Sequence, residues 1–222
     1  MFAQEAAWIA AALARLPAAR LSPLLNLGSS DRAFREVQQP WIARELFAPL
    51  AARGVRVVHS DLKEGEGIDV SGDVFDDAVF QALKAQRFGA LLCCNILEHV
   101  TGPEGLARRC EDLVATGGII VVTVPRSYPH HRDPIDTMFR PAPAGVAALF
   151  ARCRVIESAV IEPGSYRDEV RRRPWILLRH VFRAPFPFVG YPRWKLSMKK
   201  LYWLVHPYQV TCVVLERAPD QA

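Results

Sequence analysis

The sequence predicts a single domain of the doubly wound α/β class, built on a mostly parallel sheet of about seven strands. Half of the 222 residues are hydrophobic and 23% are charged, which suits one globular core and excludes a disordered or low-complexity chain. Short continuous apolar runs alternate with helical patterns, as is typical of a parallel sheet covered on both faces. Small or acidic residues directly follow several of these runs.

The first half of the chain follows this alternation closely. An amphipathic helix carries Trp8, Ile9, Leu13 and Leu16 and ends before Pro17. Four apolar runs are expected to form strands, at 24–27, 55–59, 90–94 and 118–124. One further short strand is expected just before Asp73. Helices are expected between them, at 40–53, 78–86 and 105–115.

The second half departs from the alternation after Pro125. A helix at 144–150 and a strand at 154–161 are expected, and the β-rich run 209–215 would close the sheet as an antiparallel last strand. Residues 163–207 show no strand pattern. We interpret them as a basic and aromatic insertion, or lid, within the single domain of residues 1–222.

Positive charge is concentrated in this insertion. Ten Lys or Arg lie between 167 and 200 against Asp168 and Glu169, so the segment carries +8 and the rest of the chain −3 of the net +5. Four interpretations stay open: a lid that meets an anionic group of the substrate, peripheral contact with an anionic membrane through 167–203, binding of single-stranded nucleic acid, and ordinary surface packing. The sequence favours nucleic acid least.

The composition also indicates where the protein resides and whether it binds a structural metal. No apolar run approaches the ~20 residues that span a bilayer, and Glu5 and Arg15 interrupt the N-terminal helix, unlike a signal peptide. The five cysteines include no C-x-x-C pair, so neither a zinc site nor a disulfide framework is expected. We expect a reduced, cytoplasmic protein, with peripheral membrane contact as a further option.

Polar residues follow three successive strands, and wound sheets bind ligands at these carboxyl ends. Gly28, followed by Ser29 and Ser30, permits a tight turn and close approach of a ligand to the backbone. Asp61 offers acceptors to two ribose hydroxyls, and Asp73 could accept from an adenine amine. Each feature has an ordinary structural alternative: a turn, a surface carboxylate at a strand end, and a helix cap.

A dinucleotide is the first alternative to weigh for such a site. Binding a pyrophosphate requires three glycines and a helix that begins directly after the strand. Here Ser30 and Arg32 stand where glycines are needed, and the clear helix start is at Pro40. The pattern therefore favours an adenosine-type ligand without a pyrophosphate over NAD.

Several motifs in order resemble the class I S-adenosylmethionine-dependent methyltransferases, and within them the type 11 group. They are LLNLGSS, VVHSDL, GDVFD, ALLCCNILEHV and GGIIVVTVP, and they cover residues 24–124. The resemblance implies a Rossmann-like methyltransferase fold and S-adenosyl-L-methionine as cofactor. It assigns methionine contacts to Asn26, Gly28, Ser29 and Ser30, the ribose to Asp61 and Leu62, the adenine to Asp73 and Val74, and the pocket floor near the sulfonium to Asn95 and Ile96.

The chain departs from the family pattern at the cofactor loop. Asn26 stands where the family has an acid, and Ser30 and Arg32 stand where it has glycines. A non-catalytic binding module that keeps the fold is therefore the alternative to methyl transfer.

Candidates for the acceptor side lie after the fourth and fifth strands. His99, His130 and His131 are candidate bases for an acceptor that must lose a proton, and Asp133, Asp136 and Arg140 are candidate substrate ligands. The stretch PHHRDPIDTMFRP resembles one in a subset of these methyltransferases associated with glycan or cell-surface pathways, which implies a small, sugar-linked or lipid-linked acceptor, with an anionic acceptor as one option. Alternatively, Asp136 and Arg140 pair internally and fix the loop.

Overall fold

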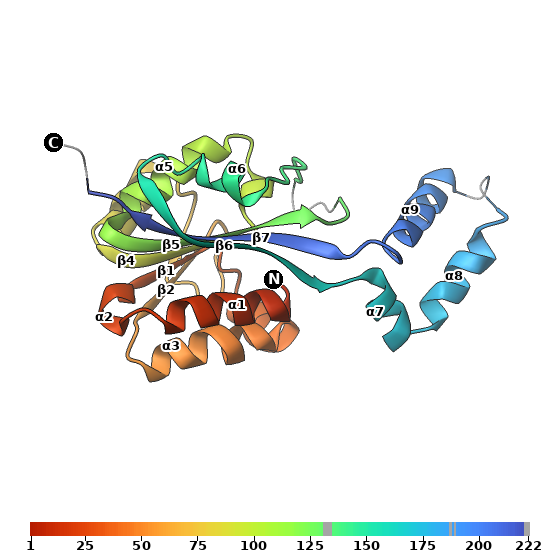
Figure 1. The fold of residues 1–222 in the computed structure, drawn as a ribbon, viewed down its shortest axis with the longest axis horizontal. Helices are drawn as coiled ribbons and strands as arrows, with labels where there is room; N and C mark the ends of the chain where they lie inside the picture. Colours follow the sequence, from red (N-terminus) through yellow and green to blue (C-terminus); the bar gives the residue numbers. More distant parts are fainter. Residues whose placement is uncertain (131–134, 187, 189, 220–222) are drawn as a thin grey trace.

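The computed structural model describes residues 1–130, 135–186, 188 and 190–219. The described residues form a seven-stranded sheet in the order β3-β2-β1-β4-β5-β7-β6 (Figure 1). The strands are β1 (Leu24–Leu27), β2 (Val57–Asp61), β3 (Val70–Ser71), β4 (Phe88–Cys94), β5 (Val114–Ser127), β6 (Cys153–Gly164) and β7 (Tyr208–Arg217).

Strand direction confirms the predicted sheet. Strands β1 to β5 are parallel to one another, whereas β7 is antiparallel to both of its neighbours, β5 and β6. It follows that β6 runs in the same direction as β1 to β5, and that their carboxyl ends share one edge of the sheet.

Helices cover both faces of this sheet (Figure 1). One face carries α1 (Ala3–Ala14), α2 (Ala18–Leu21), the π-helices η1 (Phe34–Gln38) and η2 (Ile42–Phe47), and α3 (Ala48–Ala52). The other face carries α4 (Asp77–Lys84), the 3-10 turn η3 (Leu97–His99), α5 (Pro103–Leu113) and α6 (Pro143–Ala147).

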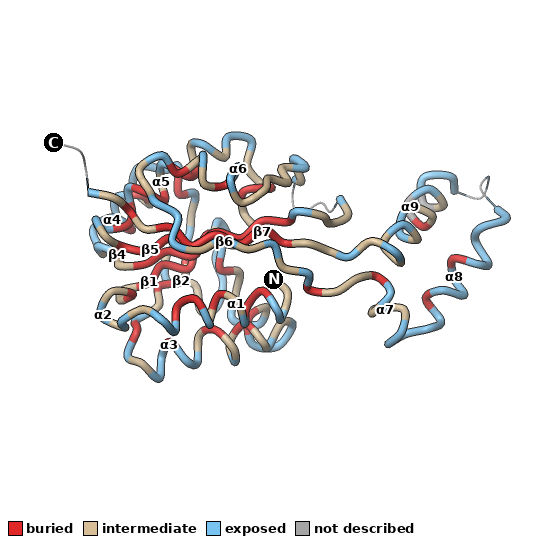
Figure 2. The backbone as a smooth tube through the Cα atoms, in the orientation of Figure 1, coloured by how far each residue is buried: buried red, intermediate tan, exposed pale blue. Residues whose placement is uncertain are grey.

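Alternation along the central strands divides the core into two layers. In β4, Leu91 and Cys93 pack toward α4 and α5, while Ala90 and Leu92 pack toward α1 and α3. These side chains are fully buried, and Figure 2 shows buried residues concentrated along the strands. Burial on both faces is why these strands appear in the sequence as unbroken apolar runs.

The expectation that the first crossover helix starts at Pro40 is wrong. Helical residues begin at Arg32, close behind the turn that follows β1, and break at Gln39 before resuming at Pro40. Gln39 has φ −129° and ψ 65°, outside the helical region, because a proline excludes the α conformation from the residue before it. The missing phosphate glycines still disfavour a dinucleotide, but the distance to the helix does not.

Residues 165–207 form a helical arm between β6 and β7. The arm contains α7 (Tyr166–Arg172), α8 (Trp175–Arg183) and α9 (Tyr191–Tyr202). Its two ends meet where Gly164 pairs with Tyr208, and α8 and α9 stand apart from the sheet and its covering helices (Figure 1). None of the helices in the described ranges is long and apolar enough to cross a membrane.

A buried arginine fixes the loops that follow β1 and β2. The guanidinium of Arg35 donates to the carbonyl oxygens of Ser29 and Ser30 and, at 2.7 Å, to that of Gly67. Arg35 is only 5% exposed. The interaction joins two loops more than thirty residues apart, so the position of the β1 loop depends on a side chain from η1.

We expect Arg35→Met to lower the free energy of unfolding by about 2–4 kcal/mol, because three carbonyl oxygens, one buried and two part-buried, lose the guanidinium as a donor. Urea unfolding measures this. The matched control is Arg44→Met on η2, whose side chain is 71% exposed and pairs with the adjacent Glu45; its effect should stay within about 0.5 kcal/mol. Equal, small losses in both variants would contradict the role assigned to Arg35.

Candidate functional site

The candidate cofactor residues meet at the carboxyl edge of the sheet. Gly28 follows β1, Asp61 ends β2, Asp73 follows β3 and Asn95 follows β4. Because β1 lies between β2 and β4, with β3 outside β2, these residues line one continuous stretch of the edge. The fold therefore brings together residues that lie up to 67 positions apart in the sequence.

The turn after β1 keeps a glycine-type backbone although it carries serines. Gly28 has φ +65° and Ser30 has φ +54°, both in the left-handed region. The backbone N–H of Ser30 donates to Asp61 Oδ2 at 2.7 Å, and Ser29 N–H donates to the carbonyl oxygen of Ser60 at 3.0 Å. The carboxylate of Asp61 thus stabilises this strained turn.

Asp61 has further acceptor capacity beyond this bond. Its Oδ1 accepts from the backbone N–H of Lys63 at 3.1 Å, and the residue is only half-buried. Two carboxylate oxygens offer about four acceptor positions, so these two bonds leave room for a ligand hydroxyl. The adjacent Leu62 is 66% exposed and stands beside the same strand end.

Asn26 is paired inside the protein. Its Nδ2 lies 3.1 Å from Nδ1 of His59 on β2, and only 7% of the residue is exposed. Burial, together with the charge of Arg35, lowers the pKa of His59 to about 4, so the imidazole is neutral and its Nδ1 can accept from the amide. A neutral pair of side chains occupies the position where the family that the sequence resembles usually has an acid.

Asn95 is held by the N-terminal helix. Its Nδ2 donates to Glu5 Oε1 at 2.7 Å, and Thr123 Oγ1 on β5 donates to the same oxygen at 2.6 Å. Glu5 Oε2 accepts from the backbone N–H of Phe2 at 3.0 Å. Asn95 has φ +55°, a left-handed conformation that asparagine tolerates better than most residues.

The side chain of Ile96 lies against the turn at Gly28, where the sequence predicts the methionine half of the site. A Cβ added to Gly28 would lie 2.7 Å from Ile96 Cδ1, so the isoleucine side chain covers the face of the glycine. That atom is the end of a flexible side chain, and a rotamer change would uncover the turn. The methionine half of the site is closed in this conformation.

The stretch around Asp73, where the sequence predicts the adenosine half of the site, borders an open pocket. Asp73 is exposed, accepts from Phe75 N–H at 2.9 Å through Oδ1, and borders a pocket of about 530 Å³. The loop after β4 and the start of α5 form the rest of the wall, with His99, Val100, Gly102 and Arg108 among the lining residues. Val74, the other predicted adenine contact, is 8% exposed and packs into the core.

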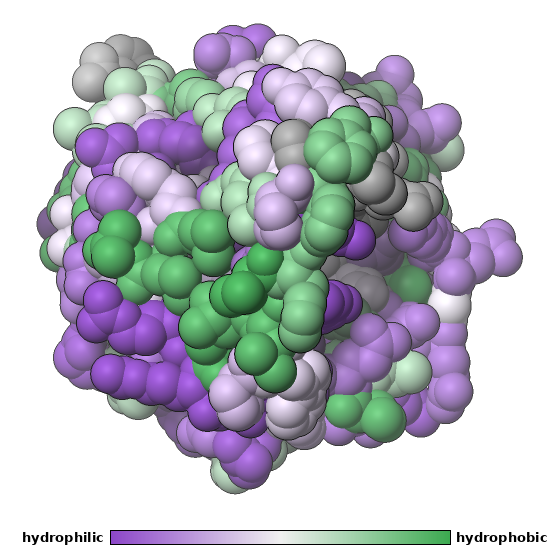
Figure 3. Space-filling model, turned by 90° about the vertical axis from the view of Figure 1, so that its right-hand side faces the viewer, coloured by the Kyte–Doolittle hydropathy of each residue, from purple (hydrophilic) through white to green (hydrophobic). Residues whose placement is uncertain are grey.

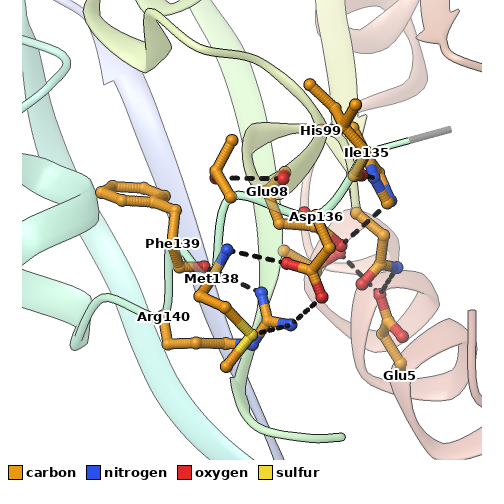
Figure 4. A network of polar contacts seen from close by, with 11 residues as sticks. Glu5, Glu98, His99, Ile135, Asp136, Met138, Phe139 and Arg140 are labelled. Carbon is orange, nitrogen blue, oxygen red and sulfur yellow. Dashed lines mark hydrogen bonds and ion pairs between the residues drawn. The ribbon is translucent and has the colours of Figure 1, made fainter. Parts of the chain in front are cut away.

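A buried acid lies beside this pocket (Figure 4). Glu98 is fully buried in η3, and both of its carboxylate oxygens lack a hydrogen-bond partner among the described residues. Burial raises its pKa to about 7, and the nearby carboxylate of Glu5 adds to the increase, while His99 and Arg140 oppose it. Glu98 Oε1 lies 3.7 Å from His99 Nε2.

The loop after β5 packs on this acid. Thr137 donates to the backbone carbonyl of Glu98 from its N–H at 2.9 Å and from Oγ1 at 3.0 Å. Ring nitrogen Nδ1 of His99 contacts the carbonyl oxygen of Ile135. Figure 4 shows the carboxylate of Asp136 directed toward Arg140, with Glu98 and His99 nearby and Glu5 entering from α1.

Asp136 and Arg140 form the internal pair that the sequence left open. Arg140 Nη2 donates to Asp136 Oδ2 at 2.7 Å, and the Asp136 side chain is fully buried. Arg140 Nε is buried without a partner among the described residues. The predicted candidate His130 is exposed, whereas the candidates His131 and Asp133 lie outside the described residues.

Sequence reasoning missed four residues that build this site: Glu5, Arg35, His59 and Glu98. A usable signal existed for two of them. Glu5 interrupts an otherwise apolar helix, and Glu98 directly follows an apolar strand and turn. A charged residue at such a position is rarely buried without a role. Within the described ranges, no group of three or more side chains that could hold a metal ion is found.

We expect the free energy of unfolding of Glu98→Gln, measured relative to that of the parent protein, to increase as the pH rises. A carboxyl whose pKa is raised by folding binds its proton more tightly in the folded state, so stability is lost between the unfolded pKa near 4.5 and the folded value near 7. The relative gain should grow over this window to at most about 3 kcal/mol.

Urea unfolding of both proteins across that pH range measures the gain. Glu64→Gln is the control, because Glu64 is exposed in the loop after β2 and should show no comparable trend. A Glu98→Gln difference that is independent of pH would contradict a protonation-linked cost at this site.

Solved structures of methyltransferases share this architecture. Coclaurine N-methyltransferase, bound to N-methylheliamine and S-adenosylhomocysteine, gives a TM-score of 0.56 at 13% identity over 93% of this chain and 70% of that one. A Galdieria sulphuraria protein provisionally assigned as a sarcosine dimethylglycine methyltransferase gives 0.54 at 11% identity, over 97% and 85%. A Bacillus halodurans protein provisionally assigned as a methyltransferase gives 0.52 at 14% identity, over 96% and 99%.

No protein-family model and no curated protein matches the chain. At identities of 11–14% the structural similarity bears on the fold alone. The strand order, the antiparallel β7 and these neighbours agree that the chain has the fold of the class I S-adenosylmethionine-dependent methyltransferases.

Proposed function

We propose that this chain binds S-adenosylmethionine at the carboxyl edge of its sheet and transfers the methyl group to a small-molecule, sugar-linked or lipid-linked acceptor. The observation that carries the proposal is the meeting of Gly28, Asp61, Asp73 and Asn95 at one edge, on the strands to which the motif resemblance assigns them. Structural neighbours that are methyltransferases support it.

In this proposal, one group of residues would bind the adenosine part of the cofactor and another group the methionine part. Asp61 and Leu62 would hold the ribose, and Asp73 the adenine, since Val74 packs into the core. The methionine end would lie along the turn of Asn26, Gly28, Ser29 and Ser30, with Asn95 and Ile96 near the sulfonium. When bound, the cofactor supplies a methyl group that is already activated, so the main task of the protein is to orient the acceptor.

Glu98 and His99 are the groups best placed to take a proton from an acceptor. His99 lines the pocket beside Asp73, and its Nε2 faces the carboxyl of Glu98. In the tautomer that donates from Nδ1 to Ile135, Nε2 carries the lone pair and can accept a proton. The pKa of Glu98, raised to about 7, suits proton exchange near neutral pH. His130 and His131 stay predicted alternatives for the base, as Asp133 does for the substrate ligand.

A second candidate function is a methyltransferase-like binding module without turnover. One observation favours it: Ile96 covers Gly28, while Asn26 and Asn95 are engaged with His59 and Glu5. These contacts fill the methionine half with the protein's own groups. The two candidates differ in whether that half opens to a ligand.

Calorimetric titration with S-adenosylmethionine tests the proposal. We expect the parent protein to bind, and Asp61→Asn to bind about tenfold or more weakly, because the amide keeps an acceptor for Ser30 N–H but loses the charge and one oxygen offered to the ribose. Ile96→Ala removes the side chain over Gly28 and should bind at least as tightly as the parent.

Asp112→Asn on α5 is the control, because this carboxylate pairs with Arg152 away from the carboxyl edge. Failure of both the parent and Ile96→Ala to bind would overturn the proposal. Binding without formation of S-adenosylhomocysteine, over a panel of small, sugar-linked and lipid-linked acceptors, would favour the binding module instead.

A further inference from the structure

The outward face of α8 is apolar. Its exposed side chains include Trp175, Leu177, Leu178, Val181 and Phe182, and Trp175 and Phe182 are 60% and 74% exposed. Phe186 and Phe188 continue the surface beyond the helix and are also exposed. Figure 3 views this end of the molecule and shows hydrophobic side chains gathered in one patch, with hydrophilic ones beside it.

This face is not the arm's own core. The opposite side of α8 carries Ile176 and His180, which are buried. His180 Nε2 lies 2.6 Å from the hydroxyl of Tyr166 on α7, and its Nδ1 lies 2.6 Å from Ser197 Oγ on α9. The three helices of the arm therefore pack together on the side of α8 that carries Ile176 and His180. The apolar surface on the other side has no covering element within the described ranges.

The Lys and Arg residues of the arm beyond Val170 are not balanced by any acidic residue, so this part of the arm is positively charged. Between Val170 and Gln209 the sequence contains no Asp or Glu and nine Lys or Arg: Arg171, Arg172, Arg173, Arg179, Arg183, Arg193, Lys195, Lys199 and Lys200. Arg179 and Arg183 lie on α8 itself and, with Trp175, Phe182 and Phe186, line a groove of about 730 Å³. Arginines thus alternate with aromatic side chains along the exposed face.

We propose that the arm, residues 165–207, docks on the surface of a bilayer that contains anionic lipids. Aromatic and aliphatic side chains on an interfacial helix enter the boundary between headgroups and acyl chains, and neighbouring cations bind anionic headgroups. The exposed face of α8 offers both, and its charge is complementary to such a surface. The inference is independent of the proposed enzymatic function, because it concerns residues outside the site.

Two other occupants fit less well. A second copy of the arm would bring two strongly cationic surfaces together without a carboxylate on either α8 or α9 to compensate them. Single-stranded nucleic acid would satisfy the cations and stack on the aromatic rings, but Leu177, Leu178 and Val181 offer nothing to stack on. Lipid is the occupant that uses the aliphatic, aromatic and cationic side chains together.

Co-sedimentation of the full chain with vesicles tests the inference. We expect binding to phosphatidylcholine vesicles that contain phosphatidylglycerol, little binding to phosphatidylcholine alone, and a bound fraction that falls as salt is added. Arg179→Gln with Arg183→Gln should weaken binding about tenfold or more, and Trp175→Ser with Phe182→Ser should do the same. All four side chains are exposed, so the variants should fold.

Matched controls lie outside the arm. Arg44→Gln with Val37→Ser removes an exposed cation and an exposed apolar side chain from η2 and η1 and should bind vesicles as the parent does. Equal binding by the arm variants and this control would overturn the inference, as would failure of the parent to bind. It would also be overturned if an oligonucleotide or self-association, and not vesicles, responded to the arm variants.

Discussion

The buried carboxylate of Glu5 is the interaction on which the carboxyl edge depends. It joins helix α1 to the turn after β4 through Asn95 and to β5 through Thr123, residues 90 and 118 positions away in the sequence. A fully buried acid with two side-chain donors and a backbone donor is stabilised only while all three are in place. The same bonds set the left-handed turn at Asn95, and that turn fixes where Ile96, Glu98 and His99 lie.

Three acidic side chains are buried near one another at this edge, and the protein accommodates each in a different way. Glu5 is stabilised by hydrogen bonds, and Asp136 by its ion pair with Arg140. The carboxylate of Glu98 has no hydrogen-bond partner among the described residues and lies 3.7 Å from His99 Nε2, and burial raises its pKa to about 7. A buried carboxyl whose pKa is raised to about 7 is typical of functional sites.

The sequence was a good guide wherever structure follows from local pattern. Strand β1 occupies the predicted residues, because a strand buried on both faces is a continuous apolar run with sharp ends. The predicted meeting of Gly28, Asp61 and Asp73 at one edge follows from the parallel sheet alone. The helix before Pro40 escaped detection because the π-helical segment η1 disturbs the 3.6-residue period. Local pattern could not reveal that Glu5 binds Asn95, or that Arg35 holds two loops, since these contacts join distant parts of the chain.

The arm and the site are related by strand direction. Strand β6 runs parallel to β1 through β5, so the chain enters the arm at Gly164 on the same edge as Gly28, Asp61 and Asn95. An arm docked on a bilayer would therefore turn the carboxyl edge, and not the opposite edge, toward the lipid. The charge distribution acts in the same sense, because a segment of +8 on a remainder of −3 orients the molecule in the field of an anionic surface.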